Sequence, residues 1–294
     1  MAVLLGLAVL LWRAVDGAEA LTLLQRADPR WLVAAALVLT LQTVLSAQRW
    51  RITAAQLGIT IPAGTAVREY YLSQVVNQSL PGGVIGDASR AVRARGAAGL
   101  LISGQAVLFE RLAGQLGLLA LLVTGLTLTI FMPAGLLWPA WVTPALLVLL
   151  TCVPIGLALA RQRISPPDTA LRRVAQRFAH AIFGRDVWLK QSSLSLATAL
   201  CNVAAFAMCA AALDVALPIL ASLTLVPLIL FAMVLPLSIG GWGLREGAAA
   251  LLFPIIGASP SEGLITSIAF GLVFLCTVLP GFLLPLLRPN APVL

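Results

Sequence analysis

Long apolar runs, separated by short polar segments, constrain this chain more than any other feature of its sequence. About 20 apolar residues in a helix cross the hydrocarbon core of a bilayer. The first run, at the amino terminus, is short for a span, but it lacks the basic start and the cleavage site of a signal peptide. The seven runs interpreted as spanning helices are 1–12, 31–47, 100–131, 137–160, 194–213, 217–237 and 264–287.

The composition excludes a water-soluble globular protein. Hydrophobic residues make up 60% of the chain and charged residues 10%, whereas soluble domains carry about 25% charged residues. The net charge of +8 does not indicate nucleic-acid binding, because the arginines cluster in short segments between apolar runs, as in cytoplasmic loops. The sequence therefore predicts an all-α, polytopic integral membrane protein that does not bind nucleic acid.

The basic segments also predict the orientation and the division of the chain. The basic end of the second span, at residues 48–51, marks the cytoplasmic side and leaves the amino terminus in the cytoplasm. The chain 1–294 is interpreted as one transmembrane domain, whose halves 1–160 and 190–294 are joined by a basic cytoplasmic loop, 161–190.

Within that loop, apolar residues recur at helical spacing and predict an amphipathic helix at the membrane surface. It rests on anionic headgroups or, as the alternative, docks a specific lipid. The apolar residues are Leu171, Val174, Phe178 and Ile182.

The chemistry of the polar side chains points away from metal sites and cofactors. The cysteines Cys152, Cys201, Cys209 and Cys276 lie inside apolar runs without a Cys-x-x-Cys spacing, so we interpret them as small buried hydrophobes. The single histidine, His180, has no His or Cys ligand near it in sequence. No phosphate-binding loop of the Walker type occurs, so any active transport would use a gradient or a partner. No cofactor is expected.

Two segments break the helical pattern and are predicted to be re-entrant. Residues 61–96 are moderately apolar and are interrupted by Pro81-Gly82-Gly83, and residues 236–257 contain a second proline followed by Gly240-Gly241. Such breaks are tolerated at membrane depth only inside the protein, because their free backbone groups need partners. Each break is followed by an Arg and a carboxylate, which indicates either an inverted repeat with a transporter site or a coincidence in a Gly- and Pro-rich chain.

The candidate site lies beside these breaks. A half-helix N-terminus offers N–H groups and a positive dipole end to a phosphate, and Arg holds phosphate through two parallel hydrogen bonds. The intramembrane charges are costly and need partners. The candidate substrate-binding residues are Asn77, Pro81, Gly82, Gly83, Gly86, Asp87, Arg90, Glu110, Arg111, Gly240, Gly241, Trp242, Gly243, Arg245 and Glu246; none is assigned a catalytic role.

Neighbouring residues on a helix diverge by about 100°, so Glu110 and Arg111, and likewise Arg245 and Glu246, are not expected to pair with each other. We expect cross-pairs between the halves, such as Glu110 with Arg245 and Arg111 with Glu246 or Asp87. The alternative is that these charges form packing salt bridges only.

Several motifs resemble one known family. They are Arg49-Trp50-Arg51, the stretch Asn-Gln-Ser-Leu-Pro-Gly-Gly-Val-Ile-Gly-Asp-Ala-Ser-Arg at 77–90, Glu110-Arg111-Leu112, and residues 236–246. Together they are similar to the transmembrane region of lysylphosphatidylglycerol synthases, the flippase-like family, over the chain up to about Leu287. The resemblance implies a bacterial inner-membrane protein that moves a lipid between leaflets. In two-part members of the family, a soluble domain attaches the amino acid to the lipid. The sequence shows no such domain, so lysyl transfer is not expected.

The leading hypothesis is thus a lipid flippase or transporter, not an enzyme, with anionic or phosphate-bearing headgroups as ligands. A membrane-embedded transferase acting on a lipid-linked substrate is the second hypothesis, although no nucleophile or metal constellation favours it. A scaffold for a separate lipid-modifying enzyme is the third. A homo-oligomer is compatible with each of the three hypotheses. The sequence does not determine the identity of the lipid, the direction of transport or the energy source.

Overall fold

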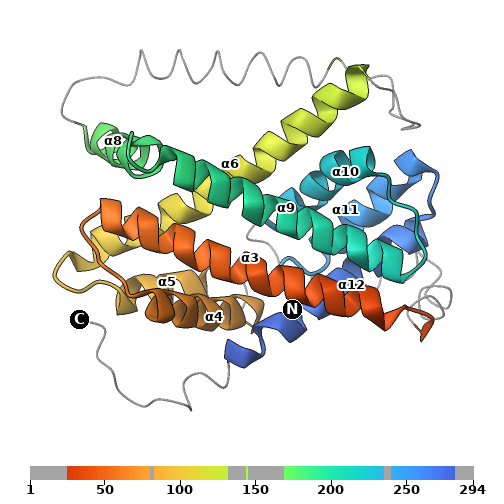
Figure 1. Cartoon of the computed structure of the whole chain (residues 1–294), viewed down its shortest axis with the longest axis horizontal. Helices are drawn as coiled ribbons and strands as arrows, with labels where there is room; N and C mark the ends of the chain where they lie inside the picture. Colours follow the sequence, from red (N-terminus) through yellow and green to blue (C-terminus); the bar gives the residue numbers. More distant parts are fainter. Residues whose placement is uncertain (1–24, 80–82, 132–143, 145–168, 235–239, 282–294) are drawn as a thin grey trace.

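The structure, a computed structural model, describes residues 25–79, 83–131, 144, 169–234 and 240–281 (Figure 1). Every element in this part of the chain is helical. Four helices are long and apolar enough to cross a membrane: α3 (Pro29–Gln56), α6 (Gly99–Phe131), α9 (Trp188–Ala212) and α12 (Pro260–Val278). The polytopic all-α fold is confirmed, while the expected spans 1–12 and 137–160 and the residues Pro81 and Gly82 lie outside the described part.

The first predicted re-entrant element is a pair of half-helices. α4 (Ala63–Ser79) and α5 (Ile85–Arg93) lie side by side beneath α3 in Figure 1. The Gly86 N–H donates to the Asn77 side-chain oxygen at 2.8 Å, and Gly86 permits this approach because a Cβ there would lie 2.0 Å from the Ser73 carbonyl oxygen. The two half-helices therefore pack as a hairpin, as expected.

The second re-entrant element begins earlier than expected. Residues 217–234, the described part of the run 217–237, contain α10 (Ile219–Phe231), followed by the 3-10 turn η1 (Ala232–Val234). At about 1.5 Å per residue, a helix of this length reaches about 20 Å, well short of a hydrocarbon core. α10 is therefore not a full span; it pairs with α11 (Leu244–Leu252), which ends in η2 (Phe253–Ile256).

The order of elements repeats with inverted direction. A long helix, two short helices and another long helix follow one another as α3–α4–α5–α6 and again as α9–α10–α11–α12. The equivalent helices α3 and α9 run antiparallel, because the Asp28 N–H donates to the Ala212 carbonyl at one end and the Gln191 amide donates to Thr53 at the other. α6 packs on α9 and α10 as α12 packs on α3 and α4. The described residues thus form an inverted repeat.

The remaining helix lies at the predicted surface position. α8 (Ala170–Phe183) begins at Thr169, whose hydroxyl accepts from the Arg172 N–H. Its apolar face packs Val174, Phe178 and Ile182 near Phe109 of α6. The predicted apolar stripe is therefore confirmed, except that Leu171 is exposed.

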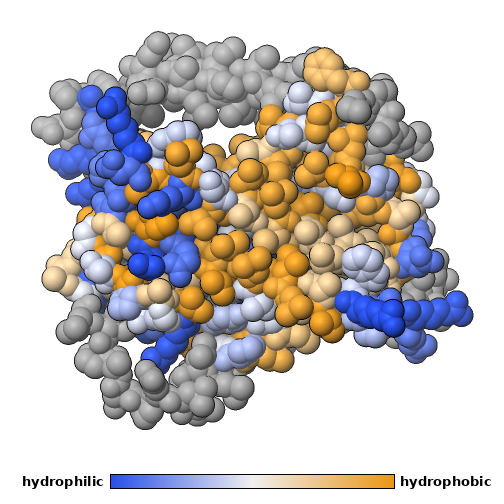
Figure 2. Space-filling view, viewed as in Figure 1, coloured by the Kyte–Doolittle hydropathy of each residue, from blue (hydrophilic) through white to orange (hydrophobic). Residues whose placement is uncertain are grey.

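The outer surface has the polarity of a membrane protein. Figure 2 shows hydrophobic side chains across the middle of the molecule and hydrophilic ones at the α8 end and at the start of α3. On α3, Val33, Leu37 and Leu41 are exposed at helical spacing, while Ala35 and Leu39 are fully buried in the core. An apolar exposed face of this kind is compatible with lipid contact.

Candidate functional site

A polar cavity of about 320 Å³ lies between the two repeats. Its walls come from α3, α4, α5, α6, α9, α10 and α12, and the turns at Gly83 and at Gly240-Gly241 also border it. Leu118, Leu230, Met233, Phe270 and Phe274 supply its apolar lining. The cavity therefore lies at the meeting point of the two broken elements, where the sequence predicted a site.

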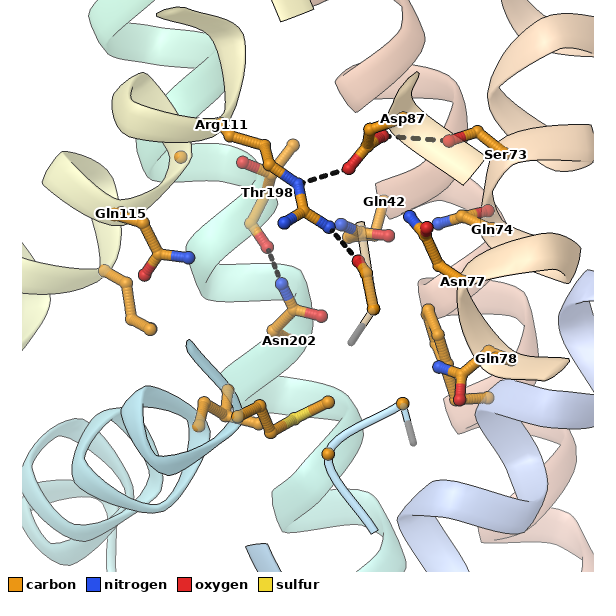
Figure 3. Close-up of a pocket in the computed structure, with 18 of the residues that line it drawn as sticks. Gln42, Ser73, Gln74, Asn77, Gln78, Asp87, Arg111, Gln115, Thr198 and Asn202 are labelled. Carbon is orange, nitrogen blue, oxygen red and sulfur yellow. Dashed lines mark hydrogen bonds and ion pairs between the residues drawn. The ribbon is translucent and has the colours of Figure 1, made fainter. Parts of the chain in front are cut away.

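Most polar groups on the cavity wall are uncharged. Three of these uncharged groups are the hydroxyls of Tyr70, Ser73 and Thr198, and the others are carboxamides. Figure 3 shows the carboxamides gathered around one open space, with Arg111 reaching into it from α6. The six carboxamide side chains on the wall are Gln42, Gln74, Asn77, Gln78, Gln115 and Asn202.

Glu110 is the centre of a buried ion network that forms part of this wall. Its Oε1 atom accepts from Arg49 Nη2 at 2.6 Å and from the Tyr70 hydroxyl at 3.2 Å, and its Oε2 atom accepts from Arg90 at 3.3 Å. Arg49 also donates to Thr198 of α9 at 2.6 Å. One carboxylate thereby connects α3, α4, α5 and α6, and Arg49 extends the network to α9.

Arg90 is held between aromatic rings. Its guanidinium carbon lies 4.5 Å from the ring centroids of both Trp50 and Tyr70, and its side chain is 1% exposed. Cation–π contacts of this kind are favourable when the cation is desolvated. Arg90 also donates to Asp87 at 3.0 Å. It therefore supports the cavity wall and does not line the cavity itself.

Arg111 is the more exposed of the two arginines, Arg49 and Arg111, that line the cavity. Its Nε atom lies 2.5 Å from Asp87 Oδ2, its Nη2 atom donates to the Gly83 carbonyl at 2.7 Å, and its side chain is 43% exposed. Asp87 Oδ1 accepts from the Ser73 hydroxyl at 2.8 Å. The predicted pair of Arg111 with Asp87 is confirmed, and both residues belong to the first repeat.

The network carries more positive than negative charge. Arg49, Arg90 and Arg111 meet the carboxylates of Asp87 and Glu110, which leaves a formal charge of +1 (three cations minus two anions). A second ion pair, between Arg93 and Glu69, lies on α5 and α4 beside the network. The charges that line the cavity and the Arg90 charge behind them therefore sum to a net positive charge, which favours an anion.

Two glycines of the second break, Gly240 and Gly241, border the side of the cavity opposite the ion network. Gly240 and Gly241 have φ angles of +57° and +85°, which only glycine adopts without strain. A Cβ on Gly240 would lie 2.1 Å from the Gln78 side-chain oxygen at the end of α4. The two broken elements thus touch at the cavity, and glycine is required for that contact.

The charges of the second repeat pair with each other, so the expectation of cross-pairs between the halves was wrong for them. Arg245 Nη2 lies 2.5 Å from Glu246 Oε1, although the two residues are neighbours on α11. Both also bond to the Ser267 hydroxyl of α12, and the Arg245 guanidinium lies 5.1 Å from the Trp242 ring. Their long side chains bend together toward this shared hydroxyl.

These residues do not form part of the cavity lining. Trp242, Gly243, Arg245 and Glu246 are absent from its walls, as are Gly86 and Arg90 of the first repeat. Glu246 also accepts from the Gly243 N–H at 2.6 Å. The Gly243 N–H at the N-terminus of α11 is thus bonded to the carboxylate of its own helix, and the predicted phosphate-binding role of this terminus stays a prediction.

Several lining residues were missed from the sequence. Arg49 was interpreted as a cytoplasmic marker, yet it is buried within α3. Gln42, Gln115 and Asn202 are isolated amides within apolar helices, and such intramembrane polar residues are costly and mark functional pathways. That signal was available and would have located the cavity.

The described residues include no group of three or more His, Cys, Asp or Glu side chains arranged to hold a metal ion.

Comparison with known families gives one match. The model described as the lysylphosphatidylglycerol synthase TM region matches residues 1–281. The comparisons with curated proteins and with solved structures find no match.

Proposed function

This chain belongs to the lysylphosphatidylglycerol synthase transmembrane family, and from that premise we propose that it moves a phospholipid or lipid-linked headgroup between membrane leaflets. The family places it among membrane proteins that handle lipids. The proposed transport role rests on one observation: the cavity between the inverted repeats is lined by many polar side chains, whereas the middle of the outer face in Figure 2 is apolar. A headgroup in such a cavity would be shielded from the hydrocarbon that otherwise opposes its crossing.

The depth of the cavity supports this proposal. Gln42 lies near the middle of α3, and Asn202 near the middle of α9. Because both helices are long enough to span, these side chains lie near the centre of the bilayer. Sites at the midplane, between inverted repeats, are typical of secondary transporters.

The basic residues support an orientation. Figure 1 shows α5, which carries Arg93, and the carboxyl end of α3, which carries Arg51, at the end of the molecule where the basic helix α8 lies. The amino end of α3, with Asp28 and Arg30, lies at the opposite end. By the positive-inside rule, the α8 end faces the cytoplasm. We therefore propose a bacterial cytoplasmic membrane protein whose amino terminus, by the span count, is also cytoplasmic.

Reconstitution into liposomes tests the proposal. Purified protein is inserted into vesicles that contain a phospholipid with a fluorescent acyl chain, and a membrane-impermeant quencher reports how much label reaches the outer leaflet. Wild-type protein is expected to bring nearly all the label within reach, whereas protein-free vesicles leave about half protected. Arg111→Gln should lower the rate at least about tenfold, because it removes the more exposed of the two cations that line the cavity.

The matched control is Arg51→Gln. Arg51 is exposed, and its hydrogen bond to Gln48 at 2.9 Å lies away from the cavity. This variant should exchange lipid at the wild-type rate. An unchanged rate in Arg111→Gln, or no exchange by the wild-type protein, contradicts the proposal.

The same vesicles separate the alternative functions. Leaflet exchange with chemically unchanged lipid supports the transporter. A new lipid product by mass spectrometry, when lipid-linked donors are supplied, supports a transferase. Neither exchange nor product supports a scaffold that acts with a separate enzyme.

A further inference from the structure

We infer that the cavity takes a small anionic polyol headgroup, a phosphodiester bearing uncharged hydroxyls such as glycerol, in preference to a headgroup that carries ammonium groups. This inference rests on the proposed function and names its substrate class. It concerns the charge and hydrogen-bonding capacity of the cavity wall, which the family description does not determine.

The carboxylates of the wall are already engaged. Both oxygens of Glu110 accept from Arg49, Tyr70 and Arg90. Asp87 accepts from Ser73 and Arg90 through Oδ1. Its Oδ2 atom accepts no hydrogen bond in the described structure and is neutralised by the ion pair with Arg111 Nε at 2.5 Å. An ammonium group brought to this wall would have to displace an arginine to reach a carboxylate. The formal charge of +1 on the network would also repel it.

Arg111 supplies a partner for a phosphate. Its Nε and Nη2 atoms contact Asp87 and Gly83, while the structure gives its Nη1 atom no hydrogen bond within the described residues. Figure 3 shows this side chain reaching into the cavity from α6. A guanidinium fixed on one side and open on the other binds a phosphate oxygen with little further loss of side-chain freedom.

The carboxamides match hydroxyl groups. An amide side chain both donates and accepts, as a hydroxyl does, whereas an ammonium only donates. The Gln115 side-chain oxygen is buried and has no hydrogen-bond partner in the described structure. It lies one helical turn from Arg111 on α6, and both side chains line the cavity. A hydroxyl next to a phosphate bound at Arg111 would satisfy it.

The cavity volume favours a small headgroup. Pockets that hold drug-sized ligands measure about 300–1,000 Å³, and the volume of about 320 Å³ lies near the lower limit. The cavity therefore suits one glycerol or one comparable polyol with its phosphate, and the acyl chains would stay in the surrounding lipid. An added aminoacyl group needs more space as well as a counter-ion.

A comparison of three labelled lipids tests the inference in the vesicle assay. Phosphatidylglycerol, its lysyl ester and phosphatidylethanolamine are compared with the same acyl label. We expect phosphatidylglycerol to exchange at least about tenfold faster than either amine-bearing lipid, because a difference of about 1.4 kcal/mol produces a tenfold ratio. Faster exchange of the lysyl ester, or equal exchange of all three, overturns the inference while the proposed function stands. No exchange of any lipid overturns both.

A charge change in the cavity sharpens the test. Gln115→Glu adds a carboxylate of nearly the same shape and offsets the formal charge of +1 that Arg49, Arg90, Arg111, Asp87 and Glu110 carry together. It should shift the ratio of the two rates about tenfold toward the lysyl ester. The matched control is Gln48→Glu on α3, outside the cavity, where the ratio should not change. An unchanged ratio in folded Gln115→Glu contradicts the assignment.

A binding measurement serves if Gln115→Glu does not fold. In detergent, phosphatidylglycerol should raise the melting temperature of the wild-type protein more than its lysyl ester does, since a ligand that binds only the folded state stabilises it. The reverse order overturns the inference independently of transport.

Discussion

Arg49 donates two hydrogen bonds to one carboxylate oxygen of Glu110, at 3.2 Å from Nε and 2.6 Å from Nη2, across 61 positions of sequence. Gly114, one helical turn beyond Glu110, makes the room: a Cβ there would lie 2.8 Å from Arg49 Nη2. Since Glu110 also binds Arg90, one buried carboxylate neutralises charge from two other helices. This relationship fixes α3, α5 and α6 around the cavity.

Glu110→Gln should destabilise the protein strongly. It leaves Arg49 and Arg90 buried without this counter-ion, and removing one partner of a buried pair costs about 3–5 kcal/mol. The free energy of unfolding, measured by denaturing-detergent titration in mixed micelles, checks this. Combining Glu110→Gln with Arg49→Gln should cost less than the sum of the two single changes, because the double variant no longer contains the Arg49 charge that Glu110→Gln alone leaves without this partner. Additive single effects would contradict a direct pair.

Gly86→Ala should separate α4 from α5. The added Cβ would meet the Ser73 backbone oxygen at 2.0 Å, and overpacking of this kind costs about 1–3 kcal/mol. Gly104→Ala is the matched control, because a Cβ on this helical glycine meets nothing within 4 Å. It should be neutral or stabilising by up to about 1 kcal/mol. Equal melting temperatures for the two variants would contradict the close helix approach.

Glu246→Gln should weaken the second repeat independently of the first. It removes the partner of Arg245 and an acceptor of the Gly243 N–H. The described residues show no hydrogen bond or ion pair between this cluster and the Glu110 network. The costs of Glu246→Gln and Glu110→Gln should therefore add within about 0.5 kcal/mol. A coupling larger than about 1 kcal/mol in unfolding titrations would revive the cross-pair hypothesis.

Thiol labelling should detect the polar cavity. In a variant whose four natural cysteines are replaced by Ala, Gln115→Cys should react with a small water-soluble thiol reagent. Leu37→Cys, on the exposed apolar face of α3, should not, because the thiolate that reacts does not form in hydrocarbon. Similar labelling of the two positions in reconstituted protein would contradict either the water-filled cavity or the membrane placement of α3.

The sequence predicted the long helices well because apolar periodicity and Pro-Gly breaks act locally. The segment 100–131 coincides with α6 to within one residue, and the break after Asn77 separates α4 from α5 as expected. The run 217–237 was predicted as a span and instead gives the short helix α10, which carries Pro227 inside it. Apolar character alone does not fix where a helix in a packed membrane protein ends, because neighbouring helices can cover a break.

Part of the site also followed from sequence. Asp87, Arg111, Gly83 and Gly240 line the cavity as proposed. The ring of carboxamides did not emerge, because Gln42, Gln78 and Asn202 come from three different helices, α3, α4 and α9. Their convergence depends on the rotation of each helix about its axis, which local patterning does not specify when both helix faces are apolar.

The sequence by itself thus determined a polytopic helical membrane protein with two broken elements and charges that needed partners. Only the tertiary structure decided which partners they took: Glu110 binds Arg49 and Arg90, whereas Arg245 binds its neighbour Glu246. The physical reason is that a buried charge pairs with whatever countercharge helix packing brings within reach. Packing brings Arg111 to the cavity and buries Arg245 against α12.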